Sequence, residues 1–474
     1  MLVGIEGKWR ICFICVSFLN NHTETIYMDV EEFARRGRKT GANADDIAAK
    51  LADRILEIKN CDRKYALEFS KAVVTEVDNS SGLSGDFFDY DKSGIKMGEF
   101  GVGSRGTGDF FVHRQFPRII GAGAEGKESN TAVGVDEMDD AGVVKAGGQY
   151  IITTVDGMHS RLSDFPFLAG FHVTRATLRD AYVMGAKPVA LLSDIHVADD
   201  GDVAKLFDYT AGIAVVSDMM NVPLVSGSTL RIGGDMVIGE RMTGCVGCVG
   251  VANHVTKRSA TKPGDILLMT EGAGGGTIAT AAIYSGYPQV VEKTINLSFL
   301  KACEALLNSP VLNRIHSMTD VTNGGLRGDV YEMAETAKCR IVVEEENLRS
   351  LVEPEVLKML DELKIDYLGV SLDALLVTAP PEVADEIIAV VKSAGVVMKK
   401  MGYVTEGPSD SKILRNGELC DFVPAFRESA YTPVKKVADK PAYDFDEMKA
   451  KVKASADAAI EKKLRVIAKL KKRY

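Results

Sequence analysis

Separated aspartates are the residues of this chain whose type and setting could carry chemistry. Asp139 and Asp140 stand in EMDDAGVV, Asp156 follows the apolar run IITTV, Asp180 comes shortly before MGAKP, and Asp320 lies in MTDVTNGG. Burial of an aspartate in the core at the end of an apolar strand costs free energy. Its hard oxygens suit Mg²⁺, which binds through few carboxylates together with substrate phosphates. Each aspartate alone is typical of a helix cap or a turn, but the set predicts magnesium–nucleotide chemistry.

A glycine-rich segment, GVGSRGTGD at 101–109, precedes these aspartates. It fits G-x-G-x-x-G, but no clear apolar strand precedes it and no acidic residue closes a second strand about 20 residues later. A Rossmann site is therefore not predicted. The backbone amides of Gly103, Gly106 and Gly108 could still close around phosphate oxygens, and Arg105 could add a bidentate contact. A flexible loop without a ligand is the alternative.

The elements that must position these residues alternate between apolar strands and helices, which predicts an α/β fold. QYIITTV at 149–155 predicts a strand and 171–184 a helix, and a similar pattern follows the turn signal KPGD at 262–265. The alternation divides the chain into a helical and then linker-like N-terminal extension (1–98), two α/β domains (99–256 and 257–430) and a basic C-terminal helix (431–474).

Composition narrows the classes of function. Of the 474 residues 46% are hydrophobic, which excludes a mostly disordered chain, and no apolar run is long enough to cross a membrane. A net charge of −9 disfavours a dedicated nucleic-acid binder. The eight cysteines are too sparse for a disulfide scaffold, and the pairs Cys12/Cys15 and Cys245/Cys248 lack the further ligands of a zinc site. We therefore expect a cytoplasmic protein.

Both ends of the sequence leave two interpretations open. The apolar stretch WRICFICVSFL at 9–19 is either a buried extra strand or part of a start assigned too early, and we favour Met28 as the real start. The basic end KKLRVIAKLKKRY at 462–474 complements a helix dipole and aids solubility, or it docks on an acidic partner, RNA or an anionic surface. We favour the first of these for the basic end.

Six segments in a fixed order resemble the aminoimidazole ribonucleotide synthetase-related, or PurM-like, superfamily. Its members include thiamine-monophosphate kinase, selenophosphate synthetase and the hydrogenase-maturation protein HypE. The resemblance covers about residues 99–408. The segments are DDAGVV (139–144), TTVDGMHS (153–160), RDAYVMGAKPVALLSD (179–194), LVSGST (224–229), KPGDILL (262–268) and MTDVTNGGLRGDVYEMAE (318–335).

The resemblance implies a two-domain α/β fold and a homodimer whose N-terminal domains pair their sheets. It also implies ATP and Mg²⁺ near that interface, and ATP-dependent phosphorylation, often of an amide or carboxamide oxygen. On this reading 99–256 is the ATP-binding domain and 257–430 the C-terminal domain of the PurM-like fold.

Site residues carry over where the motifs match. Asp139 and Asp140 match the segment that binds metal and nucleotide, and Asp156 and Asp180 match further metal positions. Asp320 and Asn323 match a loop near phosphate or substrate, and the glycine-rich segment matches one that covers the nucleotide. The residues themselves add His159, which follows Asp156-Gly157 and is the best histidine for a substrate or phosphate contact, with a packed structural histidine as the alternative.

Departures from the pattern limit the prediction. Ser228 stands where the family usually has Asp, Glu or His, and Asp235 or Glu240 could replace it. Without a cysteine between 61 and 245 the selenophosphate branch is disfavoured, and the closest motifs are those of the HypE-like and thiamine-monophosphate kinase branches.

The predicted function is ATP- and Mg²⁺-dependent phosphoryl transfer to a small-molecule or carboxamide-type oxygen. One alternative is a HypE-like maturation factor that acts on a thiol adduct of a partner protein, with Cys420 as a carrier thiol. Another, motivated by Ser228, is a non-catalytic nucleotide-binding scaffold.

Overall fold

The computed structural model describes residues 29–472 apart from 104–105, 124–128, 233–238, 323, 429 and 439–442. The expectations for residues 1–27, for Arg105 and for Asn323 lie outside the described residues. The described chain forms two compact units. The smaller holds the described residues up to Gly82 together with those of 198–200 and 232–239, and the larger holds the other described residues.

Three helices make the core of the smaller unit: α1 (Val30–Lys39), α2 (Ala44–Ile58) and α3 (Arg63–Ser80). The side chains of Asp29, Asn43 and Asp62 each accept a hydrogen bond from a backbone amide in the first turn, which explains where the helices begin. Ile47, Leu51 and Ile55 are buried at helical spacing on α2. The prediction of a helical N-terminal extension is confirmed for the described residues.

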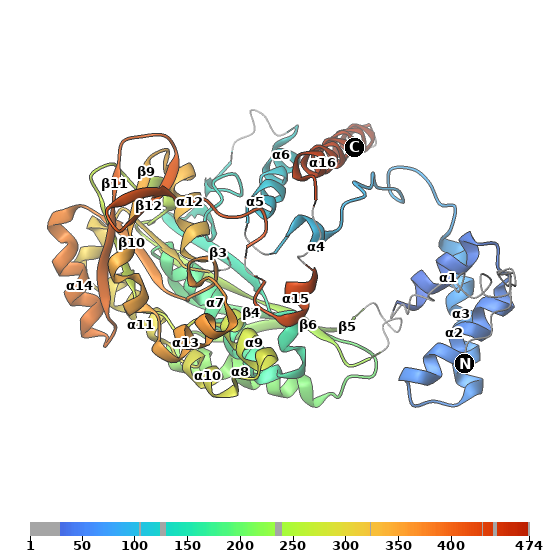
Figure 1. The fold of residues 1–474 in the computed structure, drawn as a ribbon. Coiled ribbons are helices and arrows are strands. Elements are labelled where there is room, and N and C mark those ends of the chain that lie inside the picture. Colours follow the sequence, from blue (N-terminus) through green and yellow to red (C-terminus); the bar gives the residue numbers. More distant parts are fainter. Residues whose placement is uncertain are drawn as a thin grey trace, which may run out of the picture. The chain divides into compact units, whose positions relative to one another are not determined.

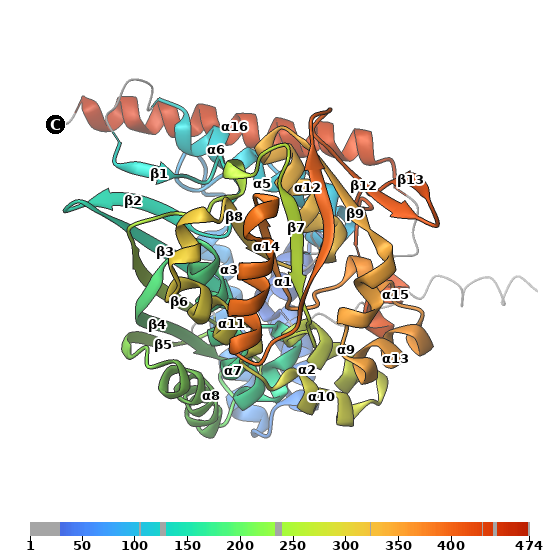
Figure 2. The same ribbon diagram turned by 90° about the vertical axis from the view of Figure 1, so that its left-hand side faces the viewer.

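The first sheet of the larger unit has the strand order β1-β2-β3-β6-β4-β5. Figure 1 labels β3 to β6 of this sheet, and Figure 2 also labels β1 and β2. Its strands are β1 (Thr131–Val133), β2 (Gly142–Ala146), β3 (Gln149–Gly157), β4 (Lys187–Val197), β5 (Leu224–Arg231) and β6 (Met242–Ala252). Pairing is antiparallel except between β4 and β5. Helix α7 (Pro166–Val183) packs against β3 and β6, and α8 (Ala204–Met220) packs on α7.

The two faces of this sheet differ because successive side chains of a strand point to opposite faces. On β3, Ile152 is buried in the core, whereas Val155 is 66% exposed. On β6, Cys248 is buried and Cys245 is half-buried, so the two cysteines lie on opposite faces. One face is therefore core and the other is an open, partly apolar surface.

The second sheet has the strand order β13-β12-β9-β11-β7-β10-β8. Its strands are β7 (Ile266–Thr270), β8 (Ser317–Asp320), β9 (Arg340–Glu344), β10 (Leu375–Ala379), β11 (Met398–Thr405), β12 (Asp410–Arg415) and β13 (Glu418–Asp421). Only β9 and β12 pair in parallel. The hairpin β12–β13 was not predicted, although Asn416-Gly417, both at positive φ, is a strong hairpin signal.

Helices cover both faces of the second sheet. They are α9 (Gly276–Ser285), α10 (Pro288–Thr294), α11 (Ser298–Leu307), α12 (Gly325–Ala337), α13 (Pro354–Leu363) and α14 (Ala384–Ser393). Short 3₁₀ turns of the larger unit lie at 160–164, 258–260, 310–314, 345–351, 367–369 and 381–383. Leu268 belongs to one apolar cluster, and its neighbours Leu267 and Met269 belong to another. The cluster around Leu268 also contains Leu178 of α7. A shared core therefore joins the two sheets, and the predicted α/β class is confirmed.

The last helix, α16 (Phe445–Lys471), lies along α6 (Gln115–Gly121), as Figure 2 shows. Lys463 Nζ donates to the carbonyl oxygens of Ile119, Ile120 and Ala122, and Arg465 pairs with Asp86. These basic side chains of the C-terminal helix thus contact their own chain. The remaining helices are α4 (Met97–Phe100), α5 (Thr107–His113) and α15 (Pro433–Ala438).

Among the described residues, no helix is both long enough and apolar enough to cross a lipid bilayer.

Candidate active site

A cavity of about 750 Å³ opens beside the first sheet. All four predicted metal ligands, Asp139, Asp140, Asp156 and Asp180, line it. The first two come from the loop before β2, Asp156 from the end of β3 and Asp180 from α7. The tertiary structure therefore brings to one cavity carboxylates that are up to 41 residues apart in the sequence.

Asp140 is held in place by residues from beyond the first sheet. Arg258, in the connection between β6 and β7, pairs with Asp140 at 2.6 Å, and the Thr319 hydroxyl on β8 donates to its other oxygen at 2.8 Å. The Arg258 backbone amide donates to Asp139 at 3.0 Å. Burial raises the pKa of Asp140 to about 7, with added repulsion from Asp320 and Asp139, although Arg258 opposes the shift. A nearby cation would therefore stabilise the ionised form of the carboxylates of this loop.

Asp180 stands in a similar setting on α7. The Thr154 hydroxyl on β3 donates to it at 3.2 Å. Burial raises the pKa of Asp180 well above its ordinary value, and the nearby carboxylates of Asp156 and Asp320 raise it further. Crowded carboxylates of this kind are stabilised in their ionised form by a cation.

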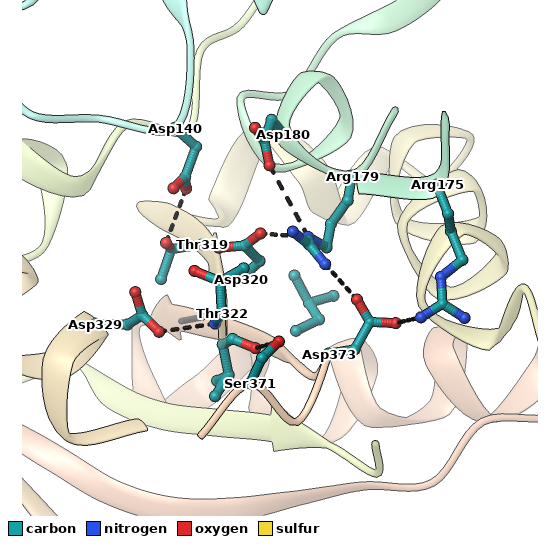
Figure 3. Close-up of polar contacts among 12 residues, drawn as sticks. Asp140, Arg175, Arg179, Asp180, Thr319, Asp320, Thr322, Asp329, Ser371 and Asp373 are labelled. Carbon is teal, nitrogen blue, oxygen red and sulfur yellow. Dashed lines mark hydrogen bonds and ion pairs between the residues drawn. The ribbon is translucent and has the colours of Figure 1, made fainter. Parts of the chain in front are cut away.

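Two arginines one helical turn apart on α7 hold the acidic residues of the second domain (Figure 3). Arg179 pairs with Asp320 and with Asp373, and Arg175 pairs with Asp373 from the other side. Arg175 also donates to the carbonyl oxygens of Thr294 and Asn296, each at 2.7 Å. Burial by itself would raise the pKa of Asp373, but the two guanidinium groups outweigh it and lower that pKa.

A smaller pocket of about 120 Å³ shares Asp156 and Asp180 with the large cavity. Asp320 and His159 also line it, so two predicted substrate contacts meet at one place. His159 Nε2 lies 3.0 Å from the Thr277 hydroxyl at the start of α9. Burial, aided by the charge of Lys435, lowers the pKa of His159 to about 4, so this imidazole is neutral near pH 7.

The glycine-rich segment makes a different contact in this structure. The amides of Thr107 and Gly108 donate to the carbonyl oxygens of Ala425 and Phe426 at 3.0 and 3.1 Å, and Gly103 donates to Asp109. A Cβ on Gly106 or Gly108 would lie 2.4 Å from a carbonyl oxygen. Glycine here permits close approach of two backbones. The predicted role of Gly103, Gly106 and Gly108 in covering phosphates stays a prediction.

The donor chemistry of the cavity suits Mg²⁺, although the described carboxylates do not form a complete metal cage. No group of three or more His, Cys, Asp or Glu side chains among the described residues is arranged to hold a metal ion. Mg²⁺ commonly takes only one or two protein carboxylates and completes its shell with phosphates and water. Asp156 and Asp180, crowded on one wall, fit that mode.

Several residues that shape the site were not predicted from the sequence. Arg179 stands directly before Asp180 in a quoted motif, so its position was visible, whereas nothing local marks Arg258 or Asp373. Ser228 on β5 pairs in register with Asp194 on β4, and Asp194 is among the residues that line the large cavity. A carboxylate therefore lies next to the position where the family's acidic or imidazole group is absent. Of the suggested replacements, Glu240 is exposed and Asp235 lies outside the described residues.

Fold and site together define a two-domain α/β protein with an acidic cavity beside its first sheet and a second pocket where the domains meet. The chain belongs to the AIR synthase related family. Its N-terminal domain model matches residues 138–252, which hold β2–β6, and its C-terminal domain model matches 262–415, which hold β7–β12. The resemblance drawn from the six sequence segments is thereby confirmed.

Three relatives illustrate the range of the family. An uncharacterized protein of Methanocaldococcus jannaschii is 49% identical over 457 residues, which cover 94% of this chain and 99% of that protein. The selenide, water dikinase of Myxococcus xanthus is 28% identical over 240 residues (50% of this chain, 66% of that protein). The thiamine-monophosphate kinase of Pyrococcus abyssi is 26% identical over 277 residues (57% and 85%).

Among solved structures, the HypE–HypF complex contains a chain of similar fold. The TM-score is 0.53 at 19% sequence identity, and the match covers 65% of this chain and 99% of that one. At this identity the likeness shows the fold.

Proposed function

We propose that this chain is an ATP- and Mg²⁺-dependent enzyme that transfers a phosphoryl group to an oxygen atom of a small molecule or of a carboxamide-type group. The observation that carries the proposal is that the acidic cavity adjoins the smaller pocket, because Asp156 and Asp180 line both. A cavity of about 750 Å³ suits a nucleotide-sized ligand. Two relatives with kinase names support the reaction class.

In this proposal, Asp156 and Asp180 would hold Mg²⁺, and Asp139 and Asp140 would line the part of the cavity that binds the nucleotide. When bound, the ion would neutralise and orient phosphate oxygens. Arg258 fixes Asp140 through its 2.6 Å ion pair, so that carboxylate is oriented before the nucleotide arrives.

The smaller pocket would place the acceptor group. Arg179 holds Asp320 at its wall, and neutral His159 offers a hydrogen bond to the acceptor or the phosphate. In the transfer, a bond forms between the acceptor oxygen and the terminal phosphorus, and the bond from that phosphorus to the bridging oxygen breaks, which releases ADP. A hydroxyl acceptor would lose its proton to water in the same step. The contribution of the chain is positioning and charge neutralisation rather than covalent catalysis.

Calorimetric titration of Mg-ATP into the wild type and Asp156→Asn tests the nucleotide site. The substitution removes one charge and keeps the shape, so we expect at least about a tenfold loss of affinity, or about 1.4 kcal/mol. Asp385→Asn is the matched control because Asp385 is exposed on α14. A wild type that does not bind Mg-ATP would overturn the proposal.

ADP formation, followed in parallel, separates the enzyme from the non-catalytic scaffold. Turnover by the wild type that Asp156→Asn lacks is expected of the enzyme. Binding of Mg-ATP that never leads to turnover across a screen of hydroxyl and carboxamide compounds would favour the scaffold. The scaffold alternative was based on the neutral Ser228. Asp194 lies beside Ser228 and provides a carboxylate at that place in the cavity, which argues against the scaffold.

The maturation-factor alternative gains no specific support from the site. Cys420 lies on β13, an edge strand of the second sheet, and is half-buried. It does not line the acidic cavity or the smaller pocket. If the chain acted on a thiol adduct of a partner protein in this site, Cys420 would therefore not take part in the reaction.

We further infer a homodimer formed through the open face of the first sheet. Val144, Val155, Leu192 and Leu230 are between 38% and 66% exposed on β2, β3, β4 and β5. All eight residues of the edge strand β5 are exposed as well. An apolar sheet face of this kind next to an unpaired edge is typical of an association surface.

A further inference from the structure

A short segment before α4 lies along the C-terminal half of helix α16. Arg465 pairs with Asp86 at 3.0 Å, and Lys469 Nζ lies 5.2 Å from the centre of the Phe87 ring. The two segments form one surface, which we call the aromatic–basic surface and define as residues 83–92 and 461–472. The residues that the two family models match include neither segment, so this surface is an addition to the shared domains.

Three aromatic side chains of this surface are open to solvent. Phe87 is 66% exposed, Phe88 is 60% exposed and Tyr90 is 71% exposed. Single exposed apolar residues are normal at a protein surface, whereas a group of large ones marks an interaction site. Flat exposed rings are the platforms on which unpaired nucleic-acid bases stack, and they accept any base because every base has a π-face.

The charge of the aromatic–basic surface is opposite in sign to that of the whole chain. The surface contains seven lysines and arginines and four aspartates and glutamates, a local excess of three positive charges, whereas the chain carries −9. Four of its lysines form no ion pair with a carboxylate of the described residues: Lys92, Lys469, Lys471 and Lys472. Because lysines without a counter-charge attract phosphates, the surface suits a polyanion.

The carboxylates of the surface separate two kinds of anionic partner. Asp86 pairs with Arg465, and Asp89 accepts a hydrogen bond from the Gly85 amide at 2.7 Å. These carboxylates alternate with the aromatic rings, so insertion of the rings into an anionic bilayer would press carboxylates against its negative surface. A nucleic-acid strand needs no such insertion, since its phosphates can follow α16 while its bases reach the rings beside the helix.

We propose that the aromatic–basic surface binds single-stranded nucleic acid without sequence preference. Bases stack on the three exposed rings, and phosphates pair with the lysines at the end of α16. Residues 462–472 span about 15 Å of helix, which gives room for a few nucleotides. A duplex fits less well because its bases are stacked on each other. No residue of this surface lines the acidic cavity, so the proposal is independent of the proposed function.

Fluorescence anisotropy on the full-length protein tests the proposal with labelled oligo(U) and oligo(dT) of about 12 nucleotides, a length within known single-strand site sizes. We expect at least one of them to bind more tightly than a duplex of the same length. Tighter binding of oligo(U) assigns RNA as the partner, and tighter binding of oligo(dT) assigns DNA. Four phosphate contacts at about −0.7 each predict a slope of about −3 for log K against log salt concentration.

Phe88→Leu tests the stacking. It keeps an apolar side chain and removes the flat ring, so affinity for the bound oligonucleotide should fall about tenfold, the effect expected for one lost base stack. Phe207→Leu is the matched control, because Phe207 is 70% exposed on α8, outside the surface. It should leave the affinity unchanged.

The double variant Lys469→Gln and Lys471→Gln tests the phosphate contacts. Loss of two contacts should make the salt slope less steep by about 1.4. Lys358→Gln with Lys392→Gln is the control, because these lysines are exposed on α13 and α14. The control should keep the wild-type slope.

Three results would overturn the proposal. They are a wild type that binds no oligonucleotide at low salt, binding that the folded surface variants do not weaken, and binding to phosphatidylserine vesicles without binding to oligonucleotides. The last result would assign the surface to a membrane. Circular dichroism shows whether each variant is folded, and all of the substituted side chains are exposed.

Discussion

Two buried arginines organise the candidate site at the scale of single residues. Arg258 is 1% exposed and contacts Asp140, Asp139 and Glu332, while Arg179 contacts Asp320 and Asp373. Burial of a guanidinium group is expensive unless its carboxylates and hydrogen bonds are well placed. In each cluster the arginine thus fixes the direction of carboxylates that face the cavity or the pocket, without itself being a ligand.

Arg258→Met should strongly destabilise the protein, because it leaves Asp140 and Glu332 buried without their counter-charge. Removal of one partner from such a cluster typically costs about 3–5 kcal/mol of the free energy of unfolding. The cost should be smaller at pH 5 than at pH 8. Burial raises the pKa of Asp140 to about 7, so this carboxyl is mostly protonated at the lower pH and needs no counter-charge there. Urea denaturation at both pH values measures this.

Arg314→Met is the control for that substitution. Arg314 pairs with Glu386 at the surface, where both side chains are about half exposed, so its loss should cost at most about 1 kcal/mol. Equal effects of the two substitutions would contradict the role given to Arg258.

At the scale of elements, the glycine-rich segment and the residues after β13 form one unit. Gly106 and Gly108 let the segment 106–108 bond to the carbonyls of Ala425 and Phe426. Phe426 in turn stacks on Phe445 at the start of α16, with ring centroids 3.7 Å apart. The C-terminal helix, the glycine-rich segment and helix α5 are thereby linked, and His113 of α5 lines the acidic cavity.

Gly106→Ala should weaken this link. The added Cβ would lie 2.4 and 2.5 Å from two backbone carbonyl oxygens, which cannot move aside as a flexible side chain can. We expect a loss of about 1–3 kcal/mol from overpacking. Faster protease cleavage within 422–445 is the measurable result. Gly98→Ala, where nothing lies within 4 Å of the added Cβ, should leave cleavage unchanged, and equal cleavage of both variants would contradict this account.

For the whole molecule, the open face of the first sheet determines the expected assembly. Val144→Lys together with Leu230→Lys places two charges on that face, at positions that do not line the acidic cavity. Burial of a lysine charge is unfavourable, so the inferred dimer should dissociate. Light scattering coupled to size exclusion should give the mass of two chains for the wild type and 51.1 kDa for the double variant.

Phe207→Lys controls for a general effect of surface charge. Phe207 is 70% exposed on α8, which packs on the side of the sheet opposite the open face. This variant should remain a dimer. A wild type of single-chain mass would contradict the inferred dimer.

The sequence by itself determined the elements and the chemical type of the site. The helical spacing of Ile47, Leu51 and Ile55 indicated α2, and the apolar run before Asp156 indicated β3. Both patterns repeat within a few residues, so they can be seen without the fold. The same local context marked Asp140 and Asp180, which do meet at one cavity.

Only the tertiary structure decided which groups meet. Arg258 is 118 residues from its partner Asp140, and Arg179 is 194 residues from Asp373. No periodicity spans such separations, because the choice of partner depends on how the two sheets are joined through a shared core. The same is true of His172 Nδ1, which has no hydrogen-bond partner among the described residues, since a missing hydrogen bond shows only when all neighbours are in place.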